Sequence, residues 1–309
     1  MKFWRTVTIF NIATIMLNRW EADMFGWKRS IPGPEVDQAQ INADRSDAVV
    51  VVGVPHDENS SFLRGPALAP RLIREALASA SSNLWTENGI DLGQETAWRM
   101  DGDIDFTEHG KAFGEIEQQI ETRLSQQYRV VSLGGDHAIT YPILRAYSRF
   151  YPDLTLIYLD AHPDLYDELD SNRYSHACSC ARIMEERLAQ RLVQVGIRTA
   201  TGHQREQARR FGVETISMRN LHLVNTLQVE GPVYLSLDLD CLDPAFAPGV
   251  SHYEPGGLST REVLRFLHQL GGCLVGADIV EFNPKRDSQG ITAMVAAKLL
   301  KEILGRMLA

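Results

Sequence analysis

This 309-residue chain has few cysteines, no excess of positive charge and no long apolar run. Its four cysteines form no CxxC pair, so no zinc-finger or dithiol redox motif is indicated, and we expect reduced thiols in a cytoplasmic protein. A net charge of −9 argues against nucleic acid as a partner, because a phosphate backbone requires a basic surface. The apolar run Val7–Leu17 is too short to span a bilayer, so no membrane partner is expected either.

The first residues differ in composition from the remainder of the chain. Residues 1–20 carry three basic residues and no acid, and no small-x-small cleavage site follows them. We expect residues 1–34 to form an N-terminal extension outside the core, and residues 35–309 to form one domain. Organelle targeting by residues 1–23, and a true start at Met24, stay open as alternatives.

Apolar segments alternate regularly with amphipathic ones along the chain. We predict strands near residues 48–54, 130–133, 154–159, 192–198, 232–237 and 273–280. We predict helices near residues 71–79, 112–126, 139–150, 176–189, 204–211, 260–270 and 293–308. Strands that alternate with helices indicate an α/β protein with a mostly parallel sheet and helices on both faces.

The predicted strand at residues 154–159 becomes polar where it ends. Asp160, His162 and Asp164 follow it at positions i, i+2 and i+4. If the chain stays extended there, all three side chains leave the same face and form half of a metal site. A strand end with solvated acids is the alternative for this motif taken alone.

Two further segments supply matching groups. Asp238 and Asp240 follow the predicted strand at residues 232–237, and His137 follows a strand that ends in Gly134-Gly135. Ligands gather at the carboxyl ends of parallel strands, and buried carboxylates repel one another unless a cation neutralises them.

Together the segments offer four Asp and two His without a thiolate, a donor set that suits Mn(II) better than Zn(II). Six groups exceed one tetrahedral site, so we expect two Mn(II) ions about 3.5–4 Å apart that share a bridging water or hydroxide. Such a cluster carries a slight negative charge and favours a cationic electrophile.

The segments GGDHAIT (134–140), DAHPD (160–164) and SLDLDCLDPAFAPG (236–249) resemble the three signatures of the ureohydrolases, the arginase and agmatinase family. The resemblance covers roughly residues 47–309. It implies a three-layer α/β/α sandwich with about eight strands, and it makes residues 35–309 a single catalytic domain. It also implies a binuclear manganese hydrolase that releases urea from a guanidinium group, assembled as a homo-oligomer, a trimer or hexamer.

The resemblance also implies roles for individual residues. One ion would be held by His137, Asp160, Asp164 and Asp238, and the other by His162, Asp160, Asp238 and Asp240. Asp160 and Asp238 would therefore bridge the two ions. His176 would pass a proton to the leaving amine, the alternative being a histidine that caps the following helix. Glu281 would accept two parallel N–H bonds from the guanidinium.

The substrate is inferred from two segments after the third signature. VSHYEPGGL (250–258) and EFNPKRD (281–287) are similar to plant-type arginases, so we expect hydrolysis of L-arginine to ornithine and urea. Agmatine, which would give putrescine and urea, or another guanidino acid stays open. Donors for the substrate tail are expected among Asn172, Arg173, Ser175 and His252, with Asn59 and Ser60 as further candidates. Arg173 is the most informative, because a guanidinium can clamp the α-carboxylate; the alternative is that it points to solvent.

Two other classes of protein must be weighed. A homologue that binds metal without catalysis would resemble this chain, but all six ligand positions, His176 and Glu281 are present. A deacetylase-like amide hydrolase shares the Asp-x-His motif. The pair Asp238 and Asp240, together with Glu281, favours two metals and a guanidinium substrate.

Overall fold

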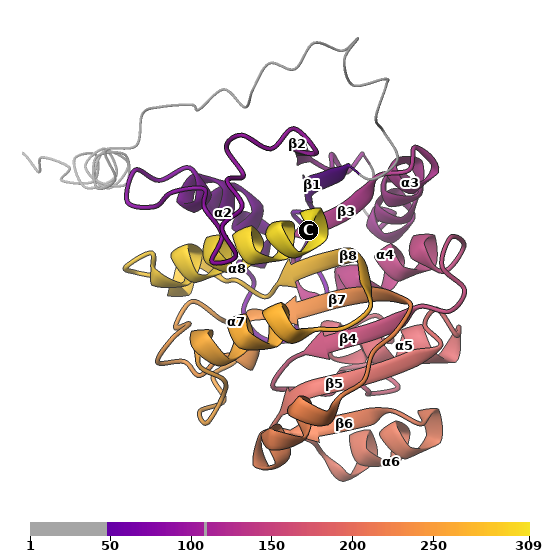
Figure 1. Ribbon diagram of the computed structural model, residues 1–309. Coiled ribbons are helices and arrows are strands. Elements are labelled where there is room, and N and C mark those ends of the chain that lie inside the picture. Colours follow the sequence, from indigo (N-terminus) through magenta and orange to yellow (C-terminus); the bar gives the residue numbers. More distant parts are fainter. Residues whose placement is uncertain (1–47, 108–109) are drawn as a thin grey trace, which may run out of the picture. The chain divides into compact units, whose positions relative to one another are not determined.

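The computed structural model describes residues 48–107 and 110–309 (Figure 1). In this part of the chain eight strands form one sheet in the order β2-β1-β3-β8-β7-β4-β5-β6, and every neighbouring pair is parallel. The strands are β1 (Val49–Gly53), β2 (Trp98–Asp103), β3 (Arg129–Leu133), β4 (Thr155–Leu159), β5 (Arg191–Ile197), β6 (Glu214–Ser217), β7 (Pro232–Asp238) and β8 (Cys273–Val280). The expected extension at residues 1–34 lies outside the described residues.

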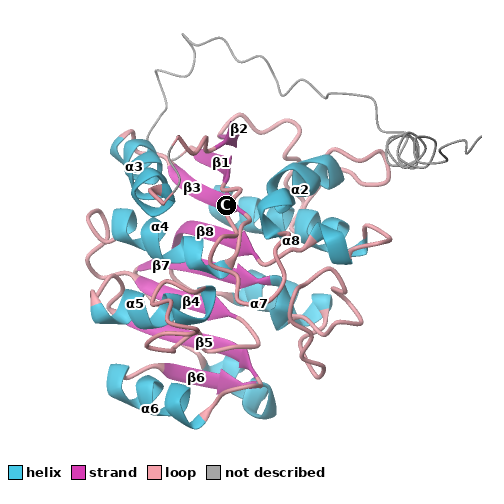
Figure 2. Ribbon diagram, turned by 180° about the vertical axis from the view of Figure 1, so that it is seen from behind, coloured by secondary structure: helices cyan, strands magenta, loops and turns pink. Residues whose placement is uncertain are grey.

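Helices cover both faces of the sheet (Figure 2). The α-helices are α2 (Ala69–Leu77), α3 (Ala112–Ser125), α4 (Thr140–Tyr147), α5 (Ser179–Glu185), α6 (Gly202–Phe211), α7 (Thr260–Gln269) and α8 (Ile291–Leu308). Short 3₁₀ turns are η1 (Pro66–Leu68), η2 (His137–Ile139), η3 (His176–Cys178), η4 (Met218–Thr226), η5 (Leu239–Cys241) and η6 (Pro284–Arg286). Helices α2, α7 and α8 pack on one face, and α3, α4 and α5 on the other. Among the described residues no helix is long and apolar enough to cross a membrane.

The central strands form where the sequence is apolar on both faces. Val49 and Val51 of β1 belong to the core under α2 and α8, whereas Val52 belongs to the core under α3 and α4. All three are fully buried. Each buried valine contributes about 1.5–3 kcal/mol, and β-branched side chains fit a pleated surface well, so this segment is stable as an inner strand.

Helix α7 is specified by its first turn and its apolar stripe. Ser259 accepts from the backbone N–H of Glu262, and the Glu262 carboxylate accepts from the backbone N–H of Ser259, which makes a capping box. Val263, Leu264 and Leu267 are buried against the sheet. Both signals are visible in the sequence, and the helix begins where they predict.

The predicted fold class is confirmed: the described residues form a three-layer α/β/α sandwich with a parallel sheet. The sequence did not predict strands β2 and β6, which are the two edges of the sheet. Strand β2 has no buried residue, and β6 has Ile216 alone. An edge strand is half exposed, so it lacks the apolar run by which the inner strands were recognised.

The strand order determines where the site lies. Strands β3, β8, β7 and β4 are consecutive neighbours, so their carboxyl ends meet at one edge of the sheet. That edge receives His137, Glu281, Asp238 and Asp160, each from a different strand.

Candidate metal centre

Strand β3 delivers His137 through a turn that only glycine permits. Gly134 has φ +58° and Gly135 has φ +97°, and a Cβ on Gly135 would lie 2.4 Å from the carbonyl oxygen of His56. The carboxylate of Asp136 then accepts from the backbone N–H of Ala138 and caps η2, of which His137 is the first residue. The histidine is therefore held at the sheet edge by the shape of the backbone.

The segment after β4 reaches the same place by a different route from the one predicted. Asp164 has φ +50°, in the left-handed region, so the chain turns after Asp160 and does not continue as a strand. The extended i, i+2, i+4 geometry expected for Asp160, His162 and Asp164 is therefore wrong. The three side chains nevertheless lie at the site, because the turn sends His162 and Asp164 toward two different groups of ligands.

Within the described residues, His, Cys and acidic side chains form two groups that can hold a metal ion: His137, Asp160 and Asp164, and Asp160, His162 and Asp240. Asp160 belongs to both. Its Oδ2 lies 3.1 Å from Nδ1 of His137, and its Oδ1 lies 3.3 Å from Nδ1 of His162. One carboxylate thus faces both groups with a different oxygen, which is the arrangement a bridging ligand requires.

Asp238 also lies in this cluster. Its Oδ2 is 3.0 Å from Nδ1 of His137, and its Oδ1 accepts from the backbone N–H of Asp240 at 2.7 Å. Asp240 Oδ2 in turn lies 3.0 Å from Nδ1 of His162. All six predicted ligands therefore converge at one edge of the sheet.

The electrostatics of the cluster call for a cation. Burial, reinforced by the carboxylate of Asp160, raises the pKa of Asp164 to about 7. Burial, together with the Asp240 and Asp160 carboxylates, raises the pKa of Asp238 well above its ordinary value. Carboxylates at this density hold protons unless a positive ion replaces them.

Two details fit a metal ion in particular. The buried Oδ2 of Asp160 has no hydrogen-bond partner among the described residues, although it faces Nδ1 of His137. His137 Nε2 lies 2.8 Å from the Ser236 hydroxyl, which itself donates to Asp278, so Nε2 carries the proton. Nδ1 faces the carboxylates of Asp160 and Asp238. Burial lowers the pKa of His137, but these carboxylates outweigh it and raise the pKa well above its ordinary value. A metal ion bound between Nδ1 and these oxygens would take the place of a proton.

A buried polar network that was not predicted supports His137 from behind. Asp278 accepts from Ser236 at 2.6 Å, from Tyr234 at 2.9 Å and from Thr140 at 3.0 Å. The Ser236 hydroxyl also lies 2.8 Å from Nε2 of His137, so the network restrains the imidazole. Partners of this kind fix the ring orientation and tautomer of a metal-binding histidine. The signal available in the sequence was an acid inside the apolar strand β8.

Glu281 and His176 form a second pair at the rim of the cluster. Oε1 of Glu281 lies 2.7 Å from Nδ1 of His176 and accepts from the backbone N–H of His137 at 2.9 Å. Burial lowers the pKa of His176, but the Glu281 carboxylate outweighs it, and the pKa is raised to about 9. Nε2 of His176 lies 2.8 Å from the hydroxyl of Ser61, a contact that sequence reasoning missed. The pair can therefore hold a proton at the rim of the cluster.

The residues predicted to bind the substrate tail differ in whether their polar groups already have hydrogen-bond partners. Asn172 donates to Oδ1 of Asn59 and accepts from the backbone N–H of Tyr174, so its amide links two loops. Ser60 donates to Asp136, as does the backbone N–H of Asn59. These groups hold the rim together. Ser175, by contrast, has a buried hydroxyl with no partner among the described residues.

Arg173 was expected to be the most informative contact to the substrate tail, but it pairs with Glu185. Its guanidinium lies 3.1 Å from Oε2 of Glu185, and its side chain is 53% exposed. A partner carboxylate already neutralises the guanidinium, so the structure gives no support to the predicted carboxylate clamp. The pairing could not be foreseen because it depends on how the loop before η3 turns toward α5.

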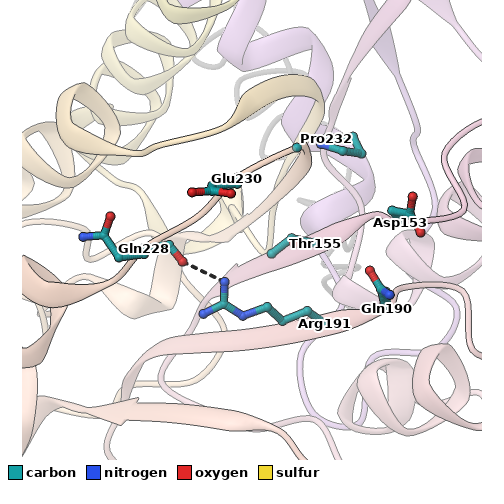
Figure 3. A pocket seen from close by; sticks show the side chains of 8 residues that line it. Asp153, Thr155, Gln190, Arg191, Gln228, Glu230 and Pro232 are labelled. Atoms are coloured by element: carbon teal, nitrogen blue, oxygen red, sulfur yellow. Dashed lines mark hydrogen bonds between the residues drawn. The ribbon is translucent and has the colours of Figure 1, made fainter.

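A shallow hollow of about 560 Å³ lies at the opposite edge of the sheet and is not part of this site (Figure 3). It is lined by residues at the amino ends of strands, among them Thr155, Arg191 and Pro232. Arg191 donates to the backbone carbonyl of Gln228 and to Glu214, so its donors are occupied. The hollow offers neither a cluster of metal ligands nor an unpartnered buried group.

A parallel sheet in an α/β/α sandwich, with overlapping groups of carboxylates and imidazoles at its carboxyl edge, is an arrangement suited to metal-dependent enzymes. Residues 47–305 match the arginase family. The chain is 47% identical over 274 residues to arginase 1, mitochondrial, of Oryza sativa subsp. indica, an alignment that covers 83% of this chain and 81% of that protein.

Solved structures agree with the sequence match. An arginase from Medicago truncatula superimposes with a TM-score of 0.80 at 41% identity, covering 85% of this chain and 88% of the other. A hypothetical agmatinase from Burkholderia thailandensis gives a TM-score of 0.77 at 33% identity, covering 84% and 85%. The chain therefore belongs to the arginase family. It is an enzyme of the ureohydrolase class, as the three signature segments indicated.

Proposed function

We propose that the protein is an arginase, which hydrolyses L-arginine to ornithine and urea with two Mn(II) ions. The observation that carries the proposal is that Asp160 belongs to both groups of metal ligands, beside the ion pair of Glu281 and His176. Manganese is favoured because the six donors are carboxylate oxygens and imidazole nitrogens, with no thiolate among them. The similarity to a plant protein named arginase 1 supports arginine as the substrate.

The ions would be held by His137, Asp160, Asp164 and Asp238, and by His162, Asp160, Asp238 and Asp240. When bound, they would lower the pKa of a shared water and provide positive charge beside the reacting carbon.

The remaining steps belong to Glu281 and His176. Glu281 binds the guanidinium of arginine: Oε1 is used by His176 and the His137 backbone, and neither contact occupies Oε2. A carboxylate that faces a planar guanidinium fixes the orientation of the reacting carbon. Water supplies the oxygen that bonds to the guanidinium carbon. His176 then gives a proton to the leaving nitrogen as the carbon–nitrogen bond breaks, so ornithine departs as an amine, urea remains, and the second proton of water restores His176.

A panel of substrates tests the proposal. Manganese-loaded protein is expected to release urea from L-arginine with a higher kcat/KM than from agmatine or 4-guanidinobutanoate. Urea is measured colorimetrically, and ornithine formation is followed by amino-acid analysis. Binding of two ions without urea release from any guanidino compound would contradict the proposal.

Agmatine hydrolysis is the second candidate function. It is favoured by the pairing of Arg173 with Glu185, which removes one cation that could have bound an α-carboxylate. One relative carries a matching name, an agmatinase of Blochmanniella floridana at 36% identity. Another is named for a third guanidino compound, a guanidinobutyrase of Pseudomonas aeruginosa at 33% identity. A higher kcat/KM for agmatine than for arginine in the same panel would select this function.

Assembly and compartment complete the proposal. We expect a homotrimer or a hexamer, and light scattering that returns a monomer would contradict this. We expect the enzyme in the cytoplasm, with targeting by residues 1–23 as the competing outcome, since the rice relative is named mitochondrial. Fusion of residues 1–23 to a fluorescent protein decides between the two by where the fluorescence collects.

A further inference from the structure

His252 lies among the catalytic groups without taking part in their hydrogen bonds. The centroid of its ring is 5.3 Å from that of His176, the proposed proton donor, and 5.7 Å from that of His162, a proposed metal ligand. The centroid of its ring also lies 5.7 Å from that of Phe62, and Phe62 is 66% exposed. The imidazole thus contacts both the buried His176 and the exposed Phe62.

The backbone on both sides of His252 is firmly held. The Ser251 hydroxyl donates to the carbonyl of Leu63 and accepts from the side-chain amide of Asn283, and Ser251 is buried. The Tyr253 hydroxyl donates to the carbonyl of Pro248 at 2.6 Å. The segment that carries the ring is therefore held before substrate arrives, which reduces the entropy lost on binding.

No hydrogen bond to either ring nitrogen of His252 occurs within the described residues, although the ring is half-buried. Asn172 and Arg173, the other candidates in the neighbouring loop, are already engaged with Asn59 and Glu185. A half-buried polar ring with unused nitrogens is available for a ligand that passes through the mouth of the site.

A row of contacts leads from Glu281 to the exposed Phe62. Nδ1 of His176 lies 2.7 Å from Oε1 of Glu281, and the ring of His252 lies against those of His176 and Phe62. Exposure rises along this row, since Glu281 and His176 are buried, His252 is half-buried and Phe62 is 66% exposed. If Glu281 holds the guanidinium, a linear substrate that extends toward the surface passes along this row. The end of the substrate that is remote from the guanidinium, where arginine and agmatine differ, then reaches the imidazole.

We propose that His252 donates a hydrogen bond to the carboxylate of the substrate tail and so determines the preference for arginine over agmatine. This inference rests on the proposed function, because it assumes a guanidino substrate held at Glu281. A neutral imidazole carries one N–H donor, and its bond to a carboxylate is charge-assisted, so its loss is expected to lower selectivity about ten- to a hundredfold.

His252→Phe tests the proposal, because it keeps an aromatic ring against Phe62 and removes the donor. Three substrates are compared: arginine, agmatine, which lacks the carboxylate, and 5-guanidinopentanoate, which lacks only the α-amino group. The variant is expected to lose about ten- to a hundredfold in kcat/KM on the two carboxylates, with agmatine unchanged. His252→Asn, which retains an N–H donor, is expected to recover part of this loss.

The failures of the two proposals can be told apart. A parent enzyme that does not prefer arginine contradicts the proposed function, whatever the variant does. A parent that prefers arginine, with a His252→Phe variant that keeps the full preference or loses equally on all three substrates, overturns the role of His252. His222→Phe, an exposed histidine of η4, is the matched control and should leave selectivity unchanged. Thermal unfolding checks that each variant is folded.

Discussion

Asp160→Asn is expected to lower kcat by about a thousandfold or more, because one side chain serves both groups of metal ligands. Asparagine keeps the size of the side chain but removes its charge and one of the two carboxylate oxygens. A loss of about 4 kcal/mol of stabilisation at the reacting centre corresponds to about a thousandfold in rate. Asp238→Asn should have a comparable effect, since Asp238 is also proposed to bridge.

The comparison with ligands of one ion makes the prediction specific. Asp164 and Asp240 each belong to a single group, so their asparagine variants should retain more activity than Asp160→Asn. Asp153→Asn, an exposed acid at the opposite edge of the sheet, is the control for loss of charge alone. Activity is measured as urea release and metal content by elemental analysis. Two bound metals with near-normal turnover in Asp160→Asn would show that the bridging assignment is wrong.

His176→Asn is expected to lower kcat by about a hundred- to ten-thousandfold while metal content stays at the parent level. His176 is not among the ligand groups, and it contacts the cluster through Glu281. Its proposed role is to give a proton to the leaving amine. KM should change little, because Glu281 and the metals continue to hold the guanidinium.

Two measurements separate this role from a structural one. Metal analysis shows whether the ligand cluster is intact, and His203→Asn, an exposed histidine of α6 that pairs with Asp167, controls for the substitution itself. A His176→Asn variant that loses metal in proportion to activity would mean that the residue supports the ligand cluster. Unchanged kcat would remove it from the mechanism.

Most of the fold could be predicted because its inner strands have a simple physical signature. Strands β1 and β4 are fully buried, and their apolar residues mark them directly. Strands β2 and β6 could not be found in this way, since their side chains are mostly exposed at the sheet edges. Their existence depends on pairing with a neighbour, which is a tertiary property.

The site was predictable to the extent that its residues follow strands. His137 and Asp238 stand at strand ends, so the parallel sheet alone brings them to one edge. The turn at Asp164 was not predictable, because a non-glycine residue in the left-handed region reflects tertiary contacts. The same holds for the support of His137 by Asp278 and for the pairing of Arg173, since these contacts join segments far apart in the sequence or depend on loop direction.

Two metal ions are proposed to act together on a guanidinium. Metal-free protein is titrated with Mn(II), and the initial rate of urea release from arginine is plotted against ions bound per chain. The account predicts that the rate rises until two ions are bound and that a chelator abolishes it. Full activity with one ion per chain, or two bound ions and no urea, would contradict it.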